Sequence, residues 1–155
     1  MALIDSYDCV LLDLDGVVYL GKTPIENAVK TIKELQSRKI NIAVITNNGS
    51  VTAKSVSKWM KDFGLDLKAS SIVTSSQTLC WYLKENYPKS SKVLVVGSEG
   101  LKESVTDAGF KVVTKADKEP VVVVNGIDAD IAQKDLAEMC YAISKGVPWV
   151  STNGD

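Results

Sequence analysis

The sequence VLLDLDG at residues 10–16 joins a short apolar run to two acidic residues and a glycine. A continuous apolar run of this kind is typical of a strand that is buried in a parallel sheet. In open α/β folds, ligands bind beyond the carboxyl ends of such strands, which is where Asp13 and Asp15 are expected. The stretch therefore predicts an α/β fold with a functional site at the end of its first strand.

The rest of the chain alternates β-branched runs with residues at helical spacing, which indicates helices packed on a parallel sheet. Further strands are predicted at 41–45, 92–96, 121–124 and 149–151. Helices are predicted at about 25–35, 56–63, 75–87, 101–108 and 136–143. The alternation starts afresh at about residue 89, so a second structural unit is expected from there.

Two helix starts are predicted from capping patterns. Thr23, Pro24 and Glu26 fit a capping box with proline at the first helical position. Asp130 and Gln133 fit the N-terminal cap of the last helix.

Composition excludes several classes of function. The 155 residues include 18 basic and 19 acidic ones, and no basic stripe indicates a nucleic-acid interface. No apolar run is long enough to span a membrane and no targeting signal is present, so a cytoplasmic protein without a membrane partner is expected. Cys9, Cys80 and Cys140 show no metal or redox spacing, and we expect them to be small buried apolar residues.

The chain contains no histidine, which removes the Ser-His-Asp triad, the Cys-His dyad and every metal site built on histidine. Catalysis would have to rest on carboxylates, hydroxyls, amides, lysines and a hard metal ion. Asp13 and Asp15 suit this chemistry, because two neighbouring carboxylates repel unless a proton or a cation lies between them. Such a pair can bind Mg²⁺ and divide the work, one as nucleophile and one as proton carrier. The alternative is that the two aspartates only solvate a loop or cap a helix.

A competing motif overlaps this pair. Residues 16–23, GVVYLGKT, match the phosphate-binding P-loop pattern G-x-x-x-x-G-K-[ST]. The bulky residues at 17–20 are poorly suited to wrapping phosphate, and Pro24 disfavours helical geometry at Thr23. No predicted strand supplies a partner aspartate for the metal. A P-loop nucleotide-binding protein nevertheless remains the alternative on this evidence.

Residues 13–19, DLDGVVY, resemble the first motif of the haloacid dehalogenase superfamily, in the form found in NagD-like and p-nitrophenyl-phosphatase-like enzymes. Residues 45–50, ITNNGS, resemble the second motif. Residues 122–130 and 151–155 resemble parts of the large α/β cap of that subfamily. The resemblance implies part of a Rossmann-like core at 1–88 and the beginning of an inserted α/β cap domain at 89–155.

The same resemblance implies a Mg²⁺-dependent phosphomonoester hydrolase that acts on a small phosphorylated metabolite. Asp13 would attack phosphorus to give an aspartyl phosphate, and Asp15 would act as general acid and base. The Asp13 carboxylate and the Asp15 backbone carbonyl would hold Mg²⁺, while Thr46 and Asn47 would bind the phosphoryl oxygens. A homodimer through the cap is also implied. The alternative for residues 46–48 is an ordinary turn from strand to helix, with Ser50 as the helix cap.

Two elements of the superfamily pattern are missing. Its third motif is a lysine and its fourth is an acidic Mg²⁺ ligand, and in enzymes with this cap position both follow the cap. We therefore expect that the chain is cut within the cap and that the 155 residues alone hydrolyse phosphate esters poorly. A non-catalytic phosphate- or metal-binding module is the second alternative.

Overall fold

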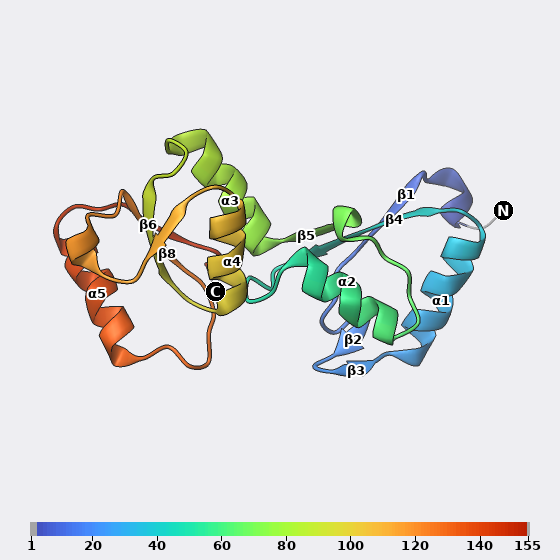
Figure 1. Ribbon diagram of the computed structural model, residues 1–155. Coiled ribbons are helices and arrows are strands. Elements are labelled where there is room, and N and C mark those ends of the chain that lie inside the picture. Colours follow the sequence, from blue (N-terminus) through green and yellow to red (C-terminus); the bar gives the residue numbers. More distant parts are fainter. Residues whose placement is uncertain (1–2, 155) are drawn as a thin grey trace. The chain divides into compact units, whose positions relative to one another are not determined.

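The computed structural model describes residues 3–154, which form two compact units (Figure 1). The first unit comprises the chain through Thr46 together with Ala53–Val73, and the second comprises Asn47–Thr52 and the chain from Thr74 onward. The chain enters the second unit briefly at Asn47–Thr52 and for the last time at Thr74. Within residues 3–154, no helix combines the length and the apolar character that a membrane crossing requires.

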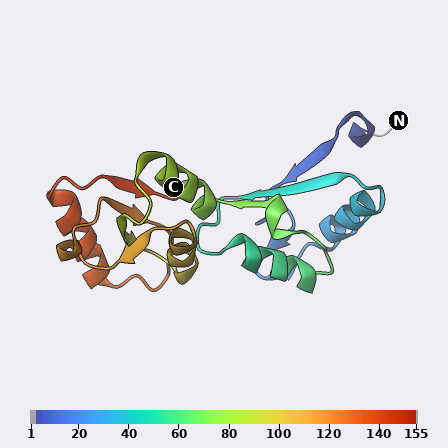
Figure 2. The ribbon, with the colours of Figure 1, turned by 45° about the horizontal axis from the view of Figure 1, so that its top comes forward.

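The first unit is built on a three-stranded sheet in the order β1-β4-β5. Its strands are β1 (Cys9–Leu12), β4 (Asn41–Thr46) and β5 (Ile72–Thr74), and its helices are α1 (Glu26–Ser37) and α2 (Ala53–Asp62). β1 and β4 are parallel, with Leu12 opposite Val44. Figures 1 and 2 show both helices on the same side of this sheet. The core between them is apolar because Val44, Val56 and Met60 are fully buried.

The opposite face of this sheet carries exposed apolar side chains. Leu11 of β1 is 63% exposed and Ile45 of β4 is 52% exposed. Leu11 pairs with Ala43, so Leu11, Ala43 and Ile45 share one face because side chains alternate along each strand. β1 also forms an edge of the three-stranded sheet.

A small hairpin precedes α1, and its presence shows that the first predicted helix cap was wrong. Strands β2 (Tyr19–Leu20) and β3 (Thr23–Pro24) pair antiparallel, so Thr23 and Pro24 belong to a strand. α1 begins at Glu26 behind Ile25, which makes no side-chain capping bond. The capping box was wrong because strand pairing of Thr23 with Leu20 takes the place of the cap.

The second unit is a parallel sheet in the order β7-β6-β8-β9, with helices on both faces. Its strands are β6 (Lys92–Val96), β7 (Lys111–Val113), β8 (Val122–Asn125) and β9 (Trp149–Ser151). Its helices are α3 (Ser75–Asn86), α4 (Glu99–Asp107) and α5 (Gln133–Ser144). Short 3-10 turns lie at Leu3–Ser6 (η1) and Ala69–Ser71 (η2) in the first unit, and at Ala116–Lys118 (η3) in the second.

Alternate residues of β6 enter two different cores, one on each face of the sheet. Val93 and Val95 pack with side chains of α3 and α4, whereas Leu94 and Val96 pack with α5. A strand buried on both faces explains the continuous apolar sequence from which it was predicted. The α/β fold class with parallel sheets is confirmed.

The cap predicted for α5 was also wrong in part. α5 begins at Gln133 as expected, but its N-cap residue is Ala132, which makes no side-chain bond. Asp130 lies in the preceding turn, where its backbone N–H donates to Asp128 Oδ1 over 3.1 Å.

The cysteines differ from one another in exposure. Cys80 on α3 is buried, while Cys9 and Cys140 are exposed, so the expectation of three buried thiols holds for one of them only. Burial raises the pKa of the Cys80 thiol from 9.0 to about 11. The thiolate is the reactive form, so the protein should hold one cysteine that reacts slowly.

At pH 8, an aromatic disulfide reagent should therefore modify two thiols of the 155-residue chain quickly. Cys80 should react on the order of a hundredfold more slowly, since a pKa near 11 reduces its thiolate fraction by about that factor. The rates are followed by absorbance, with Cys80→Ala as the control that removes the slow phase. Three equal rates in the folded protein would contradict this arrangement.

Candidate active site

Asp13 and Asp15 lie just beyond the end of β1, which finishes at Leu12. Leu14, between them, is fully buried, whereas both aspartates are exposed. The buried leucine anchors the backbone, so the two carboxylates project on the solvent side of the same short segment. This is the end of the strand at which ligands bind in α/β folds.

A tight turn follows the aspartates. The Leu14 carbonyl accepts hydrogen bonds from the N–H groups of Val18 at 2.8 Å and of Val17 and Tyr19 at 3.2 Å. Gly16 takes a φ of +77°, a backbone conformation that glycine adopts without steric cost. The turn reverses the chain and leads directly into the β2–β3 hairpin.

The hairpin contacts the aspartates in two ways. Asp15 Oδ1 accepts a hydrogen bond from the Gly21 N–H over 3.3 Å. Tyr19 is buried, and burial raises the pKa of its phenol, with further increases from the negative charges of Asp15 and then Asp13. Both carboxylates are therefore close enough to one phenol to act on it electrostatically. The electrostatic effect of the two aspartates on Tyr19 was not predicted, because the sequence offers no separate signal for it.

Thr46 is the last residue of β4, the neighbour of β1. Because the two strands run parallel with Leu12 opposite Val44, their carboxyl ends meet at one edge of the sheet. Thr46 is 4% exposed, so its hydroxyl lies within the structure at that edge. The first unit thus brings Asp13, Asp15 and Thr46 to the same edge.

Asn47 follows Thr46 directly but belongs to the second unit. Its carbonyl oxygen accepts hydrogen bonds from Ser75 Oγ and Asn153 Nδ2, each over 2.9 Å. The following turn is not a helix cap built on Ser50, because α2 begins three residues later, at Ala53. Sequence reasoning missed Ser75 and Asn153 as partners of this segment.

The hairpin also excludes the P-loop alternative. In a P-loop the helix is already running at the lysine and the hydroxyl residue that follow the glycines. Here Thr23 lies in strand β3 and the helix starts only at Glu26. Residues 16–23 therefore do not have the backbone that would cradle a phosphate.

The donor set at the edge of the sheet fits magnesium. Asp13 and Asp15 supply hard oxygen donors, and residues 3–154 hold no group of three or more Asp, Glu, His or Cys side chains placed for a metal ion. Mg²⁺ commonly binds proteins through one or two carboxylates and completes its shell with water and substrate phosphate. The pair matches that kind of open site rather than a closed cage of protein ligands.

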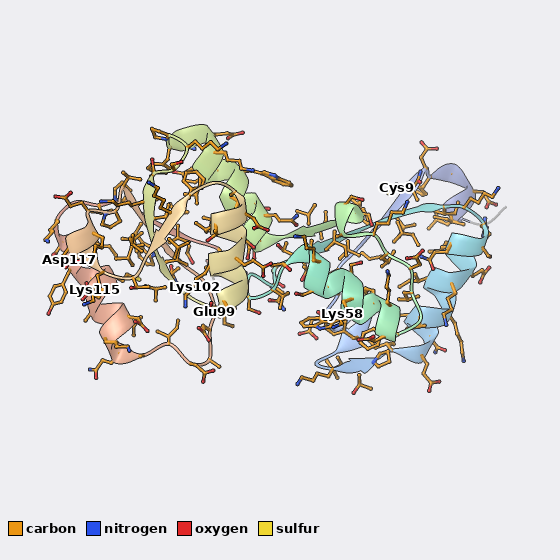
Figure 3. The ribbon with its side chains drawn as sticks, viewed as in Figure 1. Cys9, Lys58, Glu99, Lys102, Lys115 and Asp117 are labelled. Carbon is orange, nitrogen blue, oxygen red and sulfur yellow. The ribbon has the colours of Figure 1, made fainter. Side chains whose placement is uncertain are left out.

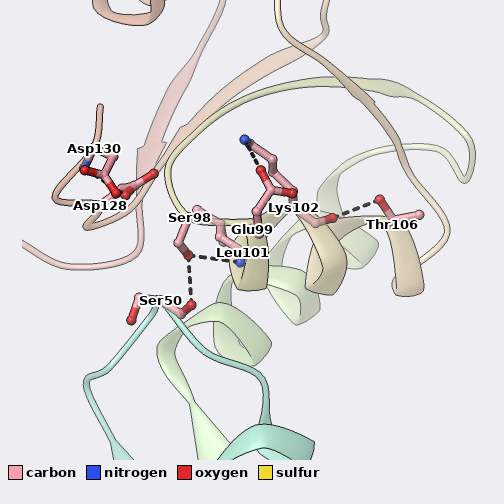
Figure 4. Close-up of polar contacts among 8 residues, drawn as sticks. All are labelled: Ser50, Ser98, Glu99, Leu101, Lys102, Thr106, Asp128 and Asp130. Carbon is pink, nitrogen blue, oxygen red and sulfur yellow. Dashed lines mark hydrogen bonds and ion pairs between the residues drawn. The ribbon is translucent and has the colours of Figure 1, made fainter. Parts of the chain in front are cut away.

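A cavity of about 360 Å³ in the second unit is a poor alternative for a phosphate. Its lining includes Glu99, Lys102, Asp128, Asp130 and Asp135. Lys102 and Glu99 lie on the same helix (Figure 3), and Lys102 Nζ is already paired with Glu99 Oε1 at 2.6 Å, an ion pair marked in Figure 4. A phosphate dianion would meet four carboxylates and one neutralised ammonium group, so the charges of the cavity lining would repel it.

Comparison with known proteins agrees with this geometry. The family model described as haloacid dehalogenase-like hydrolase matches residues 10–111, which include Asp13, Asp15, Thr46 and Asn47. The chain belongs to the haloacid dehalogenase-like hydrolase family. The resemblance inferred from the sequence motifs is thereby confirmed.

Two relatives and one solved structure illustrate this family membership. The chain is 33% identical over 154 residues to D-glycerol 3-phosphate phosphatase of Mycobacterium tuberculosis, covering 99% of this chain and 43% of that protein. It is 32% identical over 149 residues to an acid sugar phosphatase of Staphylococcus epidermidis, covering 96% and 56%. A crystal structure of the M. tuberculosis glycerol phosphate phosphatase in complex with magnesium matches with a TM-score of 0.86 and 34% identity, covering 96% and 44%. The chain thus spans about half the length of the curated relatives it matches.

Proposed function

We propose that this chain carries the nucleophile of a Mg²⁺-dependent phosphatase that hydrolyses small phosphomonoesters. The observation that supports this most is the Asp13–Asp15 pair at the end of β1, on the same sheet edge as Thr46. The relatives named above are phosphatases of glycerol phosphate and of sugars, so small phosphorylated metabolites are the substrate class.

The reaction proceeds in two displacements at phosphorus. An Asp13 carboxylate oxygen attacks, the bond from phosphorus to the ester oxygen breaks, and Asp15 donates its proton to the departing alkoxide. Asp15, now ionised, then takes a proton from water, which attacks the aspartyl phosphate, releases inorganic phosphate and regenerates Asp13. The Asp13 carboxylate and the Asp15 backbone carbonyl would hold Mg²⁺, which would supply positive charge against the phosphoryl oxygens.

Thr46 and Asn47 bind the phosphoryl group in this proposal. The Thr46 hydroxyl donates to one phosphoryl oxygen, and Asn47 contributes an amide next to it. Both lie at the start of the turn that leaves β4. Their donors offset charge that grows on the equatorial oxygens during transfer.

The exposed face of the first sheet supports a larger catalytic unit. Leu11 and Ile45 expose apolar surface on one face, and β1 has one edge that no described strand pairs with. Such a face is suited to packing against further polypeptide, and in the superfamily pattern the segments after the cap carry the lysine and the additional acidic ligand. Cytoplasmic location, the homodimer through the cap, and the assignment of core and cap stay predictions.

The protein expressed from its native gene should hydrolyse glycerol phosphate, sugar phosphates or p-nitrophenyl phosphate when Mg²⁺ is present. Removing the metal with EDTA should reduce the rate by at least about a hundredfold, because the phosphoryl charge loses its counter-ion, and added Mg²⁺ should restore it. Released phosphate is the measured quantity. Phosphate binding without any turnover would favour a non-catalytic binding module, and turnover that EDTA leaves unchanged would contradict the metal-dependent mechanism.

A further inference from the structure

The segment Asn47–Thr52, here called the 47–52 loop, joins the phosphate-binding end of β4 to helix α2. Although both of those elements belong to the first unit, the loop belongs to the second. Three of its backbone carbonyls, those of Asn47, Gly49 and Ser50, accept hydrogen bonds from side chains of the second unit.

The first turn of α3 supplies two of these bonds. Ser75 Oγ donates to the Asn47 carbonyl over 2.9 Å, and Ser76 Oγ donates to the Gly49 carbonyl over 2.6 Å. Ser76 is fully buried, so its bond lies out of reach of competing water. Gly49 also has no room for a side chain, since an added Cβ would lie 2.9 Å from Ser75 Oγ.

The start of α4 supplies a third bond. Ser98 is the N-cap of this helix, and its hydroxyl accepts from the Leu101 N–H over 3.3 Å while donating to the Ser50 carbonyl over 2.9 Å (Figure 4). The backbones come close together here, because a Cβ on Gly100 would lie 2.4 Å from the Ser50 carbonyl oxygen. The loop is thus fixed to two helices of the second unit.

We propose that Ser75, Ser76 and Ser98 are positioning residues through which the second unit sets the place of Asn47. This inference rests on the proposed function, in which Asn47 binds the substrate phosphoryl group. Because three backbone carbonyls of the 47–52 loop accept hydrogen bonds from these side chains, the backbone at Asn47 is held in one conformation. Phosphate affinity therefore depends on a set of hydroxyl groups that never touch phosphate.

The first test measures amide hydrogen exchange in the 155-residue chain. In Ser76→Ala and Ser98→Ala, amides of the 47–52 loop should exchange about tenfold faster, as expected when a buried carbonyl loses its donor. Ser104→Ala is the matched control, because Ser104 Oγ also donates to a backbone carbonyl, that of Gly100, over 2.8 Å. Ser98→Thr keeps both the donor and the cap and should restore slow exchange. If amide exchange in the 47–52 loop is unchanged in Ser76→Ala and Ser98→Ala, these side chains do not hold the loop and the proposal is wrong.

The second readout is the affinity for inorganic phosphate in the presence of Mg²⁺, followed by NMR shifts of the same chains. Ser76→Ala and Ser98→Ala should weaken phosphate binding about tenfold, whereas Ser104→Ala should leave it unchanged. Faster exchange with unchanged phosphate affinity would overturn the positioning role. If the unaltered 155-residue chain binds no phosphate, the same titration is made with the protein expressed from its native gene, where absence of binding would contradict the proposed function. The exchange comparison decides separately whether the second unit holds the loop.

Discussion

Asp13→Asn is expected to lower kcat for phosphomonoester hydrolysis by at least about ten-thousandfold in the protein expressed from its native gene. The amide of asparagine has nearly the shape of the carboxylate but lacks the anionic oxygen that attacks phosphorus. Asp13 is exposed at the end of β1, so the substitution should leave the free energy of unfolding nearly unchanged. Steady-state rates and denaturant unfolding measure the two quantities.

The matched control is Asp8→Asn, which neutralises another exposed aspartate immediately before β1. It changes the net charge by the same amount and should retain full activity. An Asp13→Asn enzyme with a rate within tenfold of the unaltered protein would rule out Asp13 as the nucleophile.

Asp15→Asn is expected to give a loss that depends on the leaving group. For alkyl phosphates such as glycerol phosphate, kcat should fall about a hundred- to ten-thousandfold, because the departing alkoxide needs a proton. For p-nitrophenyl phosphate the rate of the first displacement should fall much less, because p-nitrophenolate is a stable leaving group without a proton. Asparagine keeps an oxygen that can accept the Gly21 N–H, so the hairpin contact is retained.

The leaving-group comparison separates proton transfer from a structural role of Asp15. A burst of p-nitrophenolate equal to the enzyme concentration should precede slow turnover in this variant, as the aspartyl phosphate forms but hydrolyses slowly. If kcat falls equally for both substrates and no burst is seen, Asp15 has a role other than general acid.

Two strands of the second unit could be predicted closely from the sequence. β6 was expected at 92–96 and lies there, because a strand buried on both faces has a continuous apolar sequence. β9 was expected at 149–151 and also lies there, although it is an edge strand with exposed residues. The hairpin of β2 and β3 was missed, since strands of two residues are too short to show any periodicity. Thr23 shows the limit of local patterns, because it satisfies a capping sequence yet pairs with Leu20.

The candidate site likewise includes residues that could be predicted from the sequence and residues that could not. Asp13 and Asp15 were predicted because they come directly after a recognisable strand, at the edge of the sheet where ligands bind. Thr46 was predicted because residues 45–50 resemble the second motif of the superfamily. Ser76 and Ser98 were missed because their partners are distant in sequence: Ser76 lies 27 positions after Gly49, and Ser98 lies 48 positions after Ser50. A hydroxyl that donates across such a separation leaves no local signature in the sequence.

The most direct test of the central claim is to trap the covalent intermediate on Asp13. The native-gene protein is mixed with Mg²⁺ and substrate, quenched in acid after milliseconds, digested with trypsin and analysed by mass spectrometry. The peptide that ends at Lys22 should gain about 80 Da on Asp13, the mass of one phosphoryl group. Hydroxylamine should remove this group, and Asp13→Asn should not acquire it. A phosphoryl group on any other residue, or full activity with no labelled peptide in rapid-quench experiments, would contradict it.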